Sequence, residues 1–234
     1  MVEGQTIQSG KGVKPDAKTL LLPLGDCNLL VRFGDTLSDK ANRRAVLAAQ
    51  ILSAASIPGV MEVTPSLVSV CLRYDQRRTG FSQLSANVSL ALNSAVEKHE
   101  TKPRTIEINV AYGGEFGPDF LTAAAKCKLS PEEFVAAHNS AKLRVLATGF
   151  APGFVYCGMH KQSLHISRRK KIHTKVPPGS VIFAAGQTAI TATSVPTGWH
   201  VIGRTEFRNF NATNVPPTKL AAGNIVHFTG RIAQ

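Results

Sequence analysis

The chain has 234 residues, of which 43% are hydrophobic and 18% charged, a composition typical of folded globular proteins rather than of disordered chains. This length allows one large domain or two small ones. No apolar run reaches the roughly 20 residues that a membrane span needs. Residues 1–18 are polar and rich in Gly and Lys, without the apolar core of a signal peptide, so we expect a flexible leader and a cytoplasmic protein.

The net charge of +12 is concentrated in the second half of the chain. Residues 1–110 hold 13 Lys and Arg against 10 Asp and Glu, whereas residues 111–234 hold 14 against 5. The segment His160–Lys175 carries six of these cations and no acid. Such a segment can attract nucleic acid, an anionic substrate or an acidic partner, and it can also be a solvated loop. It lacks aromatic residues that stack on bases, which argues against nucleic acid.

Metal binding is not predicted. The four cysteines are scattered, with no CxxC pair and no Cys/His spacing of the zinc type, which favours free thiols in a reducing compartment. The histidines at 160, 165 and 173 lack the i, i+4 spacing of a helical metal site. We interpret Cys157 as a buried, inert thiol, because no placed partner indicates a thiolate.

The first predicted element is a β-hairpin. Apolar residues alternate at 20, 22 and 24 and at 29, 31 and 33, on either side of the turn sequence GDCN. A helix is expected from Ser38, a suitable N-cap, to Ala55, with Leu47, Ile51 and Ala55 on its apolar stripe. A Pro-Gly pair then stops the helix.

Three more elements complete the first unit and begin the second. Residues 68–74 alternate as a strand, and residues 84–96 repeat apolar side chains every four positions, as a helix does. Residues 106–110 alternate again. The chain up to residue 104 is therefore predicted to be an α+β domain, and it contains no obvious catalytic cluster.

Two short helices are predicted next. Pro118 suits the first position of one helix, and Ser130 and Glu133 form a capping box at the start of another that extends through His138. The pair resembles a helix-turn-helix DNA reader. However, the second helix opens with two glutamates, which would face the phosphates and repel them, so DNA reading is disfavoured.

Beyond residue 143 the sequence predicts a β-sandwich or barrel, because short β-branched runs alternate with Gly, Pro and Thr. The stretch GFAPGFVYCGM, residues 149–159, places two Phe and one Tyr around a stiff Pro. Aromatic residues on a loop are typical of an interface or a pocket wall. We expect Phe150 and Phe154 to line a cleft shared with a partner; the alternative is that both plug the end of the barrel.

The motifs YGGEFGPD, LSPEEFVAAHNSAKLRV, GFAPGFVYCG, an Arg pair with VPPGSV, GQT, GW and IGRT follow one another in this order. The series closely resembles the KipI family, whose members are also named allophanate hydrolase subunit 1 or the B subunit of 5-oxoprolinase. The resemblance covers nearly the whole chain from about Leu20. It implies an α+β N-terminal domain, residues 19–104, followed by a mainly β, cyclophilin-like barrel domain, residues 105–234.

This resemblance also implies that the protein functions as one subunit of a complex. It suggests a carboxyltransferase-like second subunit and a third 5-oxoprolinase subunit, and ATP-dependent opening of 5-oxoproline to glutamate or the related allophanate hydrolase and urea carboxylase chemistry. An alternative from the same family is a KipI-type inhibitor of a sensor histidine kinase. ATP is expected at the level of the complex, since this chain has no phosphate-binding Gly-rich motif, and no biotin or metal site is evident in it.

The chain departs from the family pattern at two places. Where the family commonly has Ser-Pro-Gly-Gly-Trp, this chain has Val195-Pro196-Thr197-Gly198-Trp199, and a Tyr-Pro pair is replaced by Thr191-Ala192. Near the C-terminus a usual Gly-Asp is Gly223-Asn224. These changes affect loop flexibility and charge, and so bear on the substrate.

Candidate ligand-binding residues lie mainly in the barrel. Arg204 and Arg168 offer planar, two-pronged donors for a carboxylate or phosphate, although an arginine can also bond loop carbonyls. Gln187 and Thr188 can hydrogen-bond an amide-bearing substrate or satisfy barrel backbone. Trp199, in the GW motif, joins the two phenylalanines of the aromatic stretch as a candidate substrate contact.

Two further residues are candidates for proton transfer, and Arg204 is grouped with them as a catalytic candidate. By resemblance to the family motif, His138 is a general acid or base, whereas its place after Phe134 and Val135 favours a core histidine. Glu115, in the YGGEFGPD turn, is either a base or a helix-end residue.

Overall fold

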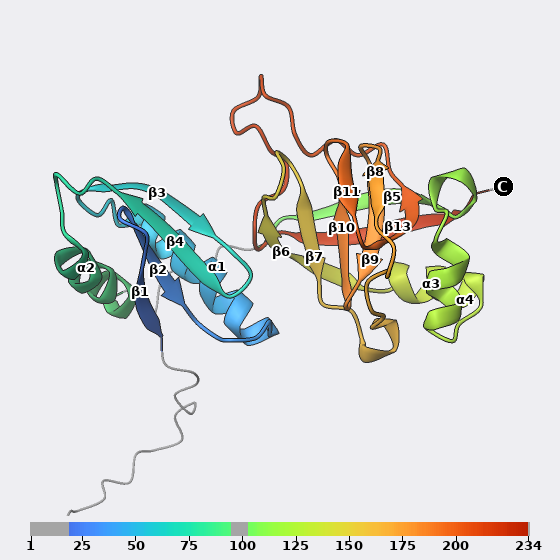
Figure 1. The fold of residues 1–234 in the computed structure, drawn as a ribbon, viewed down its shortest axis with the longest axis horizontal. Coiled ribbons are helices and arrows are strands. Elements are labelled where there is room, and N and C mark those ends of the chain that lie inside the picture. Colours follow the sequence, from blue (N-terminus) through green and yellow to red (C-terminus); the bar gives the residue numbers. More distant parts are fainter. Residues whose placement is uncertain (1–18, 95–102, 234) are drawn as a thin grey trace, which may run out of the picture.

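The computed structural model describes residues 19–94 and 103–233 (Figure 1). The expected leader lies outside the described residues. The first part contains β1 (Leu20–Leu24), β2 (Asn28–Arg32), α1 (Asp39–Ala54), β3 (Val60–Pro65), β4 (Ser69–Tyr74) and α2 (Phe81–Ser94). Its strands form an antiparallel sheet in the order β1-β2-β4-β3, and the two helices pack together over a core that includes Leu29, Leu72, Leu84 and Val88. The predicted hairpin is confirmed, with Leu24 opposite Asn28.

Helix α1 begins where the sequence predicted, but its buried face differs. The Ser38 hydroxyl accepts a hydrogen bond from the Ala41 amide at 3.2 Å, as an N-cap should. Of the predicted stripe only Ile51 is buried, because Leu47 is 37% exposed and Ala55 lies on the surface. The buried face is instead rich in alanine. Small side chains let the helix lie close against β3 and β4, so size rather than hydrophobicity selects this face.

The second part is mainly β. Its strands are β5 (Thr105–Tyr112), β6 (Lys142–Thr148), β7 (Val155–Gly158), β8 (His173–Val176), β9 (Ser180–Ala184), β10 (Gln187–Ile190), β11 (Val195–Thr197), β12 (His200–Arg204) and β13 (Ile225–Ile232). Seven of them close a barrel in the order β10-β7-β6-β13-β5-β12-β9, in which only the β13–β5 pair is parallel. The predicted barrel is thus confirmed. The domain boundary at residue 104 remains a prediction.

Period-2 alternation assigns each barrel strand an inner and an outer face. On β5, Ile108, Val110 and Tyr112 are buried in the barrel core, whereas Glu107 and Asn109 point outward. The outer faces of β7, β9 and β10 are covered by the small β8–β11 sheet, which buries a second apolar cluster there. The barrel therefore has one apolar core inside and another on part of its outer surface.

Two short helices, α3 (Phe120–Lys126) and α4 (Pro131–Asn139), lie on the side of the barrel away from the first sheet (Figure 1). The capping box is confirmed, since Ser130 and Glu133 exchange hydrogen bonds of 3.1 and 2.7 Å. Pro118, predicted to open the first helix, instead precedes the N-cap Asp119. Helix α4 packs on β13 with Phe134 and Val135 buried, so its apolar face serves packing rather than DNA reading.

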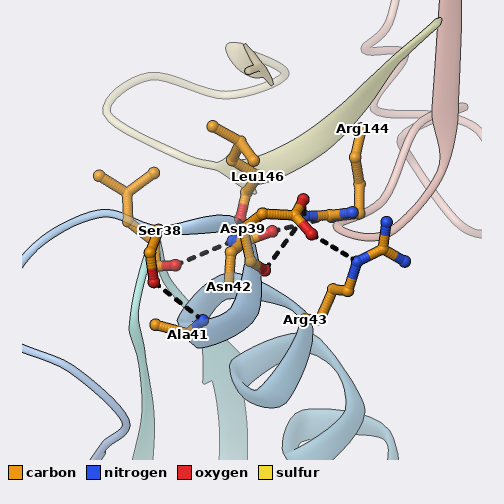
Figure 2. Close-up of polar contacts among 8 residues, drawn as sticks. Ser38, Asp39, Ala41, Asn42, Arg43, Arg144 and Leu146 are labelled. Carbon is orange, nitrogen blue, oxygen red and sulfur yellow. Dashed lines mark hydrogen bonds and ion pairs between the residues drawn. The ribbon is translucent and has the colours of Figure 1, made fainter.

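The barrel contacts the first part of the chain through a polar junction between α1 and β6 (Figure 2). Arg144 of β6 donates from Nε to Oδ1 of Asn42 at 3.0 Å and forms an ion pair with Asp39. The Asn42 amide donates to the carbonyls of Leu67 and Leu146, both at 2.9 Å. Asn42 is fully buried, and these contacts satisfy its side chain. None of the helices in the described ranges has the length and apolar character needed to cross a bilayer.

Candidate functional site

Inside the barrel, five polar side chains form a continuous hydrogen-bonded row, which we call the buried polar chain: His160, Thr188, His138, Tyr112 and Asn139. The Thr188 hydroxyl lies 2.8 Å from Nε2 of His160 and 2.8 Å from Nε2 of His138. The Tyr112 hydroxyl lies 2.8 Å from Nδ1 of His138 and 2.8 Å from Oδ1 of Asn139. The buried polar chain joins α4, β5, β10 and the loop after β7, which are distant in sequence.

The partners define the direction of every proton in this row. Asn139 donates from Nδ2 to the Gly230 carbonyl at 3.0 Å, so its Oδ1 accepts the Tyr112 hydroxyl proton. Tyr112 therefore accepts from His138 Nδ1–H, and in a neutral imidazole this leaves His138 Nε2 as the acceptor for the Thr188 proton. Thr188 in turn accepts from His160 Nε2–H. Each histidine is neutral in this arrangement.

Burial explains why both histidines stay neutral. Desolvation, and then the nearby His160, lowers the pKa of His138 well below its usual value. Desolvation, together with His165, lowers the pKa of His160 to about 4. Desolvation also raises the pKa of the Tyr112 hydroxyl. At neutral pH the whole buried polar chain is uncharged.

The buried polar chain changes what can be expected of His138 and Thr188. His138 is 0% exposed, so in this conformation it cannot contact a substrate directly. Both of its nitrogens and the Thr188 hydroxyl are occupied within the barrel. One end of the row is His160 Nδ1, which is buried and has no hydrogen-bond partner among the described residues. The other end is the half-buried Asn139, whose side-chain amide is not a titrating group. A role of His138 in proton transfer therefore requires passage through Thr188 and His160.

A second group of candidate substrate-binding residues lies outside the barrel, in and beside a row of aromatic rings. The ring centroids of Phe150 and Phe154 are 5.4 Å apart, those of Phe154 and Tyr156 are 4.8 Å apart, and those of Tyr156 and Trp199 are 6.0 Å apart. The Arg168 guanidinium lies 5.8 Å from the Trp199 ring centre. The tertiary structure thus brings four predicted substrate contacts, together with Tyr156, into one place.

Burial divides this row. Phe154 and Trp199 are only 3% and 7% exposed and belong to the apolar cluster beneath the β8–β11 sheet. They serve packing, and Phe154 does not plug the end of the barrel, because it packs in this outer cluster and not in the barrel core. Phe150 is different, since it is 70% exposed and has a φ of 73°, a left-handed conformation that is strained for a residue with a Cβ.

The basic segment is partly engaged by the protein itself. Arg169 forms an ion pair with the buried Asp119 at 3.3 Å, and its amide donates to the Gly198 carbonyl. Asp119 also accepts from His173 and from the Val201 amide, each at 2.8 Å. Arg169 therefore anchors the segment to the barrel, whereas Arg168 is exposed.

Arg204 lies at the end of β12 and lines a cavity of about 520 Å³, a volume suited to a small ligand. The wall includes Glu107 and Asn109 of β5, Phe116, and the segment from Arg204 to Arg208 that leaves the barrel. No described carboxylate forms an ion pair with the Arg204 side chain, and no described group accepts a hydrogen bond from it. Arg204 is therefore available to a ligand.

Two candidates stand apart from these groups. Glu115 is exposed in a short 3₁₀ turn and caps no helix, although its neighbour Phe116 lines the cavity. Gln187 is half-buried and makes no side-chain hydrogen bond with the described residues; it faces away from Thr188 on β10. Cys157 is fully buried, and desolvation raises the pKa of its thiol, as expected for an inert cysteine.

Sequence reasoning missed some of the residues in both places. Tyr112 was not singled out, because nothing local indicated that it would meet His138. His160 was weighed only as a metal ligand and as part of the basic segment. Glu107 and Arg208 were not considered for the cavity. In the part of the chain that the structure describes, no three His, Cys, Asp or Glu side chains gather closely enough to hold a metal ion.

Comparison with known proteins identifies the class. A family model described as "Carboxyltransferase domain, subdomain C and D" matches residues 19–220, so the chain belongs to this family. It is 34% identical over 215 residues to a protein of Bacillus subtilis named as the B subunit of 5-oxoprolinase, with 88% of this chain and 90% of the relative covered. A protein of the same name from Escherichia coli O157:H7 is 32% identical over 216 residues, covering 88% and 93%.

Solved structures agree on the fold. The crystal structure of TTHA0988 superposes with a TM-score of 0.76 at 29% identity and covers 88% of this chain, which spans 40% of that protein. PH0987 from Pyrococcus horikoshii, described as a conserved uncharacterized protein, is 35% identical over 91% of this chain and 98% of its own, with a TM-score of 0.53. The urea amidolyase of K. lactis shares the fold at 15% identity, with a TM-score of 0.73; the match covers 95% of this chain and 16% of that enzyme.

Proposed function

We propose that this chain is the B-type subunit of an ATP-dependent 5-oxoprolinase, which opens the lactam of 5-oxoproline to form glutamate. The observation that carries the proposal is the full-length similarity to two proteins named as 5-oxoprolinase B subunits, each covered over at least 90% of its length. A similarity limited to one half of the chain would support only a shared fold. Here it includes both the barrel and the first sheet.

The geometry supports different roles for Arg204, Glu115 and the buried polar chain within this subunit. Arg204, an unpaired residue in the wall of a cavity of about 520 Å³, is suited to hold the substrate carboxylate through a two-pronged hydrogen bond. Glu115 directly precedes the cavity-lining Phe116 and remains a candidate base. The buried polar chain holds the barrel interior in a single protonation state, and any proton that His138 transfers passes through it.

The partners and the nucleotide follow from the same proposal. A carboxyltransferase-like second subunit and a third 5-oxoprolinase subunit complete the complex, and ATP binds at the level of the complex. Arg168 is one of the exposed cations of the basic segment that can reach a phosphate, whereas Arg169 is held by Asp119. The exposed Phe150 suits the contact with a partner subunit, because large apolar side chains are enriched at interfaces.

The test is ATP-dependent release of glutamate from 5-oxoproline by this chain alone and by the chain co-purified with both partner subunits. Activity is expected only in the complex, and Arg204→Gln should reduce it at least about tenfold without preventing assembly, as measured by size-exclusion chromatography. A stable complex that releases no glutamate from 5-oxoproline but cleaves allophanate or another urea derivative would replace the proposed substrate.

A kinase inhibitor of the KipI type is the alternative function from another class. It needs a binding surface but no catalytic residues. The relatives from Bacillus subtilis and Escherichia coli are named as 5-oxoprolinase subunits, and no contact within the described residues specifically favours the inhibitor. Failure to assemble with either partner subunit, combined with inhibition of a histidine kinase, would establish that alternative.

A further inference from the structure

The cavity beside Arg204 lies where strands β5 and β12 of the barrel are not hydrogen-bonded to each other. Strand β5 pairs with β12 only through Gly203 opposite Tyr112 and Arg204 opposite Ala111. On its other side β5 pairs with β13 along its whole length. From Thr105 to Val110, the edge of β5 that faces β12 therefore has no partner strand, and no backbone hydrogen bond from another described segment reaches it.

The cavity lining confirms that this edge is open to it. Glu107, Asn109 and Ala111 come from the outer face of β5, whereas Ile108 comes from the inner face, and all four line the cavity. A cavity that touches both faces of one strand lies at its edge. The backbone N–H and C=O groups there are free to pair with an amide, as a sheet edge pairs with an added strand.

Charged side chains surround this edge without neutralising one another. Besides Arg204, the lining includes the exposed Arg208, Glu107 and Glu206. Within the described residues, none of these four takes part in an ion pair or a side-chain hydrogen bond. Apolar contacts come from Phe116 and Phe207. The cavity thus combines cations for a carboxylate, a free edge for an amide and apolar surface for methylene groups.

We propose that this cavity is the subsite for a γ-lactam that bears a carboxylate, with Arg208 and Arg204 holding the carboxylate and the open edge of β5 pairing with the lactam amide. The proposal rests on the proposed function for the choice of 5-oxoproline as ligand. It adds Arg208 and the β5 edge, which no motif in the sequence indicated. Glu107, on the same edge, is placed to form an ion pair with the ammonium group of the product, glutamate.

The first experiment is isothermal titration of the full chain with 5-oxoproline, 2-pyrrolidinone and glutamate. 5-Oxoproline should bind, whereas 2-pyrrolidinone, which lacks the carboxylate, should bind at least about tenfold more weakly, as expected for the loss of one charge-assisted pair. Arg208→Gln should weaken 5-oxoproline binding about tenfold and leave 2-pyrrolidinone binding unchanged. Glu107→Gln should weaken binding of glutamate more than that of 5-oxoproline.

Arg78→Gln is the matched control, because Arg78 is an exposed arginine of the first part and does not line the cavity. It should bind 5-oxoproline as the natural chain does. Equal binding by Arg208→Gln and Arg78→Gln, or equal binding of 5-oxoproline and 2-pyrrolidinone, would overturn the subsite. Unchanged far-UV circular dichroism will establish that the variants are folded.

The assembled complex separates this inference from the proposed function. If the free chain binds no ligand, the KM for 5-oxoproline of the complex becomes the readout, and Arg208→Gln should raise it about tenfold more than Arg78→Gln does. An active complex with unchanged KM in Arg208→Gln keeps the function and overturns the subsite. A complex inactive on 5-oxoproline, together with Arg208-dependent binding, keeps the subsite and overturns the function.

Discussion

Arg144 of the barrel donates a hydrogen bond from Nε to Oδ1 of Asn42 on α1, 3.0 Å away, at the centre of the junction in Figure 2. Arg144 is 8% exposed and Asn42 is 0% exposed, so water cannot replace either partner without a local opening. The two residues are separated by 102 positions in sequence. This single contact therefore reports whether the barrel and the helix are correctly joined.

Replacing Arg144 with Leu should lower the free energy of unfolding by about 1–3 kcal/mol, because it leaves the side-chain oxygen of Asn42 buried without its donor. The lower end is expected, since the partner carboxylate of Asp39 is 55% exposed and partly solvated. Urea unfolding can be followed by far-UV circular dichroism and by fluorescence of Trp199, which is the only tryptophan and lies in the apolar cluster on the outer surface of the barrel. The two probes should coincide in the natural chain and separate in the variant.

Arg43 provides the control for this variant. It also pairs with Asp39, at 2.7 Å, but it is 68% exposed. Arg43→Leu should change the free energy of unfolding by less than about 0.5 kcal/mol. An equal effect of both substitutions would show that Asp39, rather than the buried junction, carries the stabilisation.

Thr188→Val should destabilise the barrel by about 2–4 kcal/mol, because it removes the hydroxyl that serves both His138 and His160 and leaves two buried nitrogens without partners. Thr188→Ser keeps the hydroxyl and should cost less. The exposed Thr174 of β8 serves as control, since Thr174→Val removes no buried hydrogen bond. Thermal unfolding followed by Trp199 fluorescence measures all three, and identical melting temperatures for Thr188→Val and Thr188→Ser would refute the bridging role.

Stability should fall as the pH is lowered from about 6.5 towards 4. The folded-state pKa of His160 is lowered to about 4, and that of His138 is lowered well below its usual value, both chiefly by burial. Between these values and the unfolded pKa of about 6.5, the unfolded chain binds more protons, so the stabilisation present above pH 6.5 is lost with acid.

Each histidine contributes at most about 1.4 kcal/mol per pH unit in this interval. Urea unfolding at about pH 7, 6 and 5 measures the slope, and His160→Gln should reduce it. Desolvation also lowers the pKa of His200, so part of the slope should persist in that variant. A free energy of unfolding that stays constant over this range would contradict the neutral assignment of the buried polar chain.

The turn between β9 and β10 offers a stabilising substitution. Ala185 and Gly186 form a two-residue connection, with φ values of 51° and 70°. Both residues are left-handed, as in the type I′ turn that favours Asn-Gly. Ala185→Asn should raise the free energy of unfolding by about 0.5–1 kcal/mol, whereas Ala185→Val should lower it. If both substitutions raise the free energy of unfolding measured with urea, or both lower it, the left-handed backbone at residue 185 is not the cause of the changes.

Much of the fold was predictable because its signals are local. Alternation identified the hairpin, the strand at β4 and the inner face of β5, and the capping box located α4. The face of α1 was predicted wrongly, because the alanines that pack on the sheet resemble surface residues in a hydrophobicity pattern. The start of α3 at Pro118 was also predicted wrongly, because a proline suits several positions near the start of a helix.

The candidate site was less predictable. The motifs selected Arg204, His138, Thr188, Phe150 and Trp199, but they did not say which of these residues lie together. The structure divides them among the barrel interior, an outer apolar cluster and a cavity at a strand edge. Alternation alone cannot make this division, because it assigns a residue to a face without saying what covers that face.

The sequence by itself determined the family, the α+β and barrel elements, the basic second half and the absence of local metal or phosphate motifs. Only the tertiary structure decided that His138 is sealed within a neutral polar chain, and that β5 leaves an open edge beside Arg204. Both results arise from barrel closure, which joins residues from 26 to 50 positions apart in the polar chain and sets how many residues of β12 pair with β5. Such long-range pairing depends on the geometry of the whole barrel and leaves no signal in any short stretch of sequence.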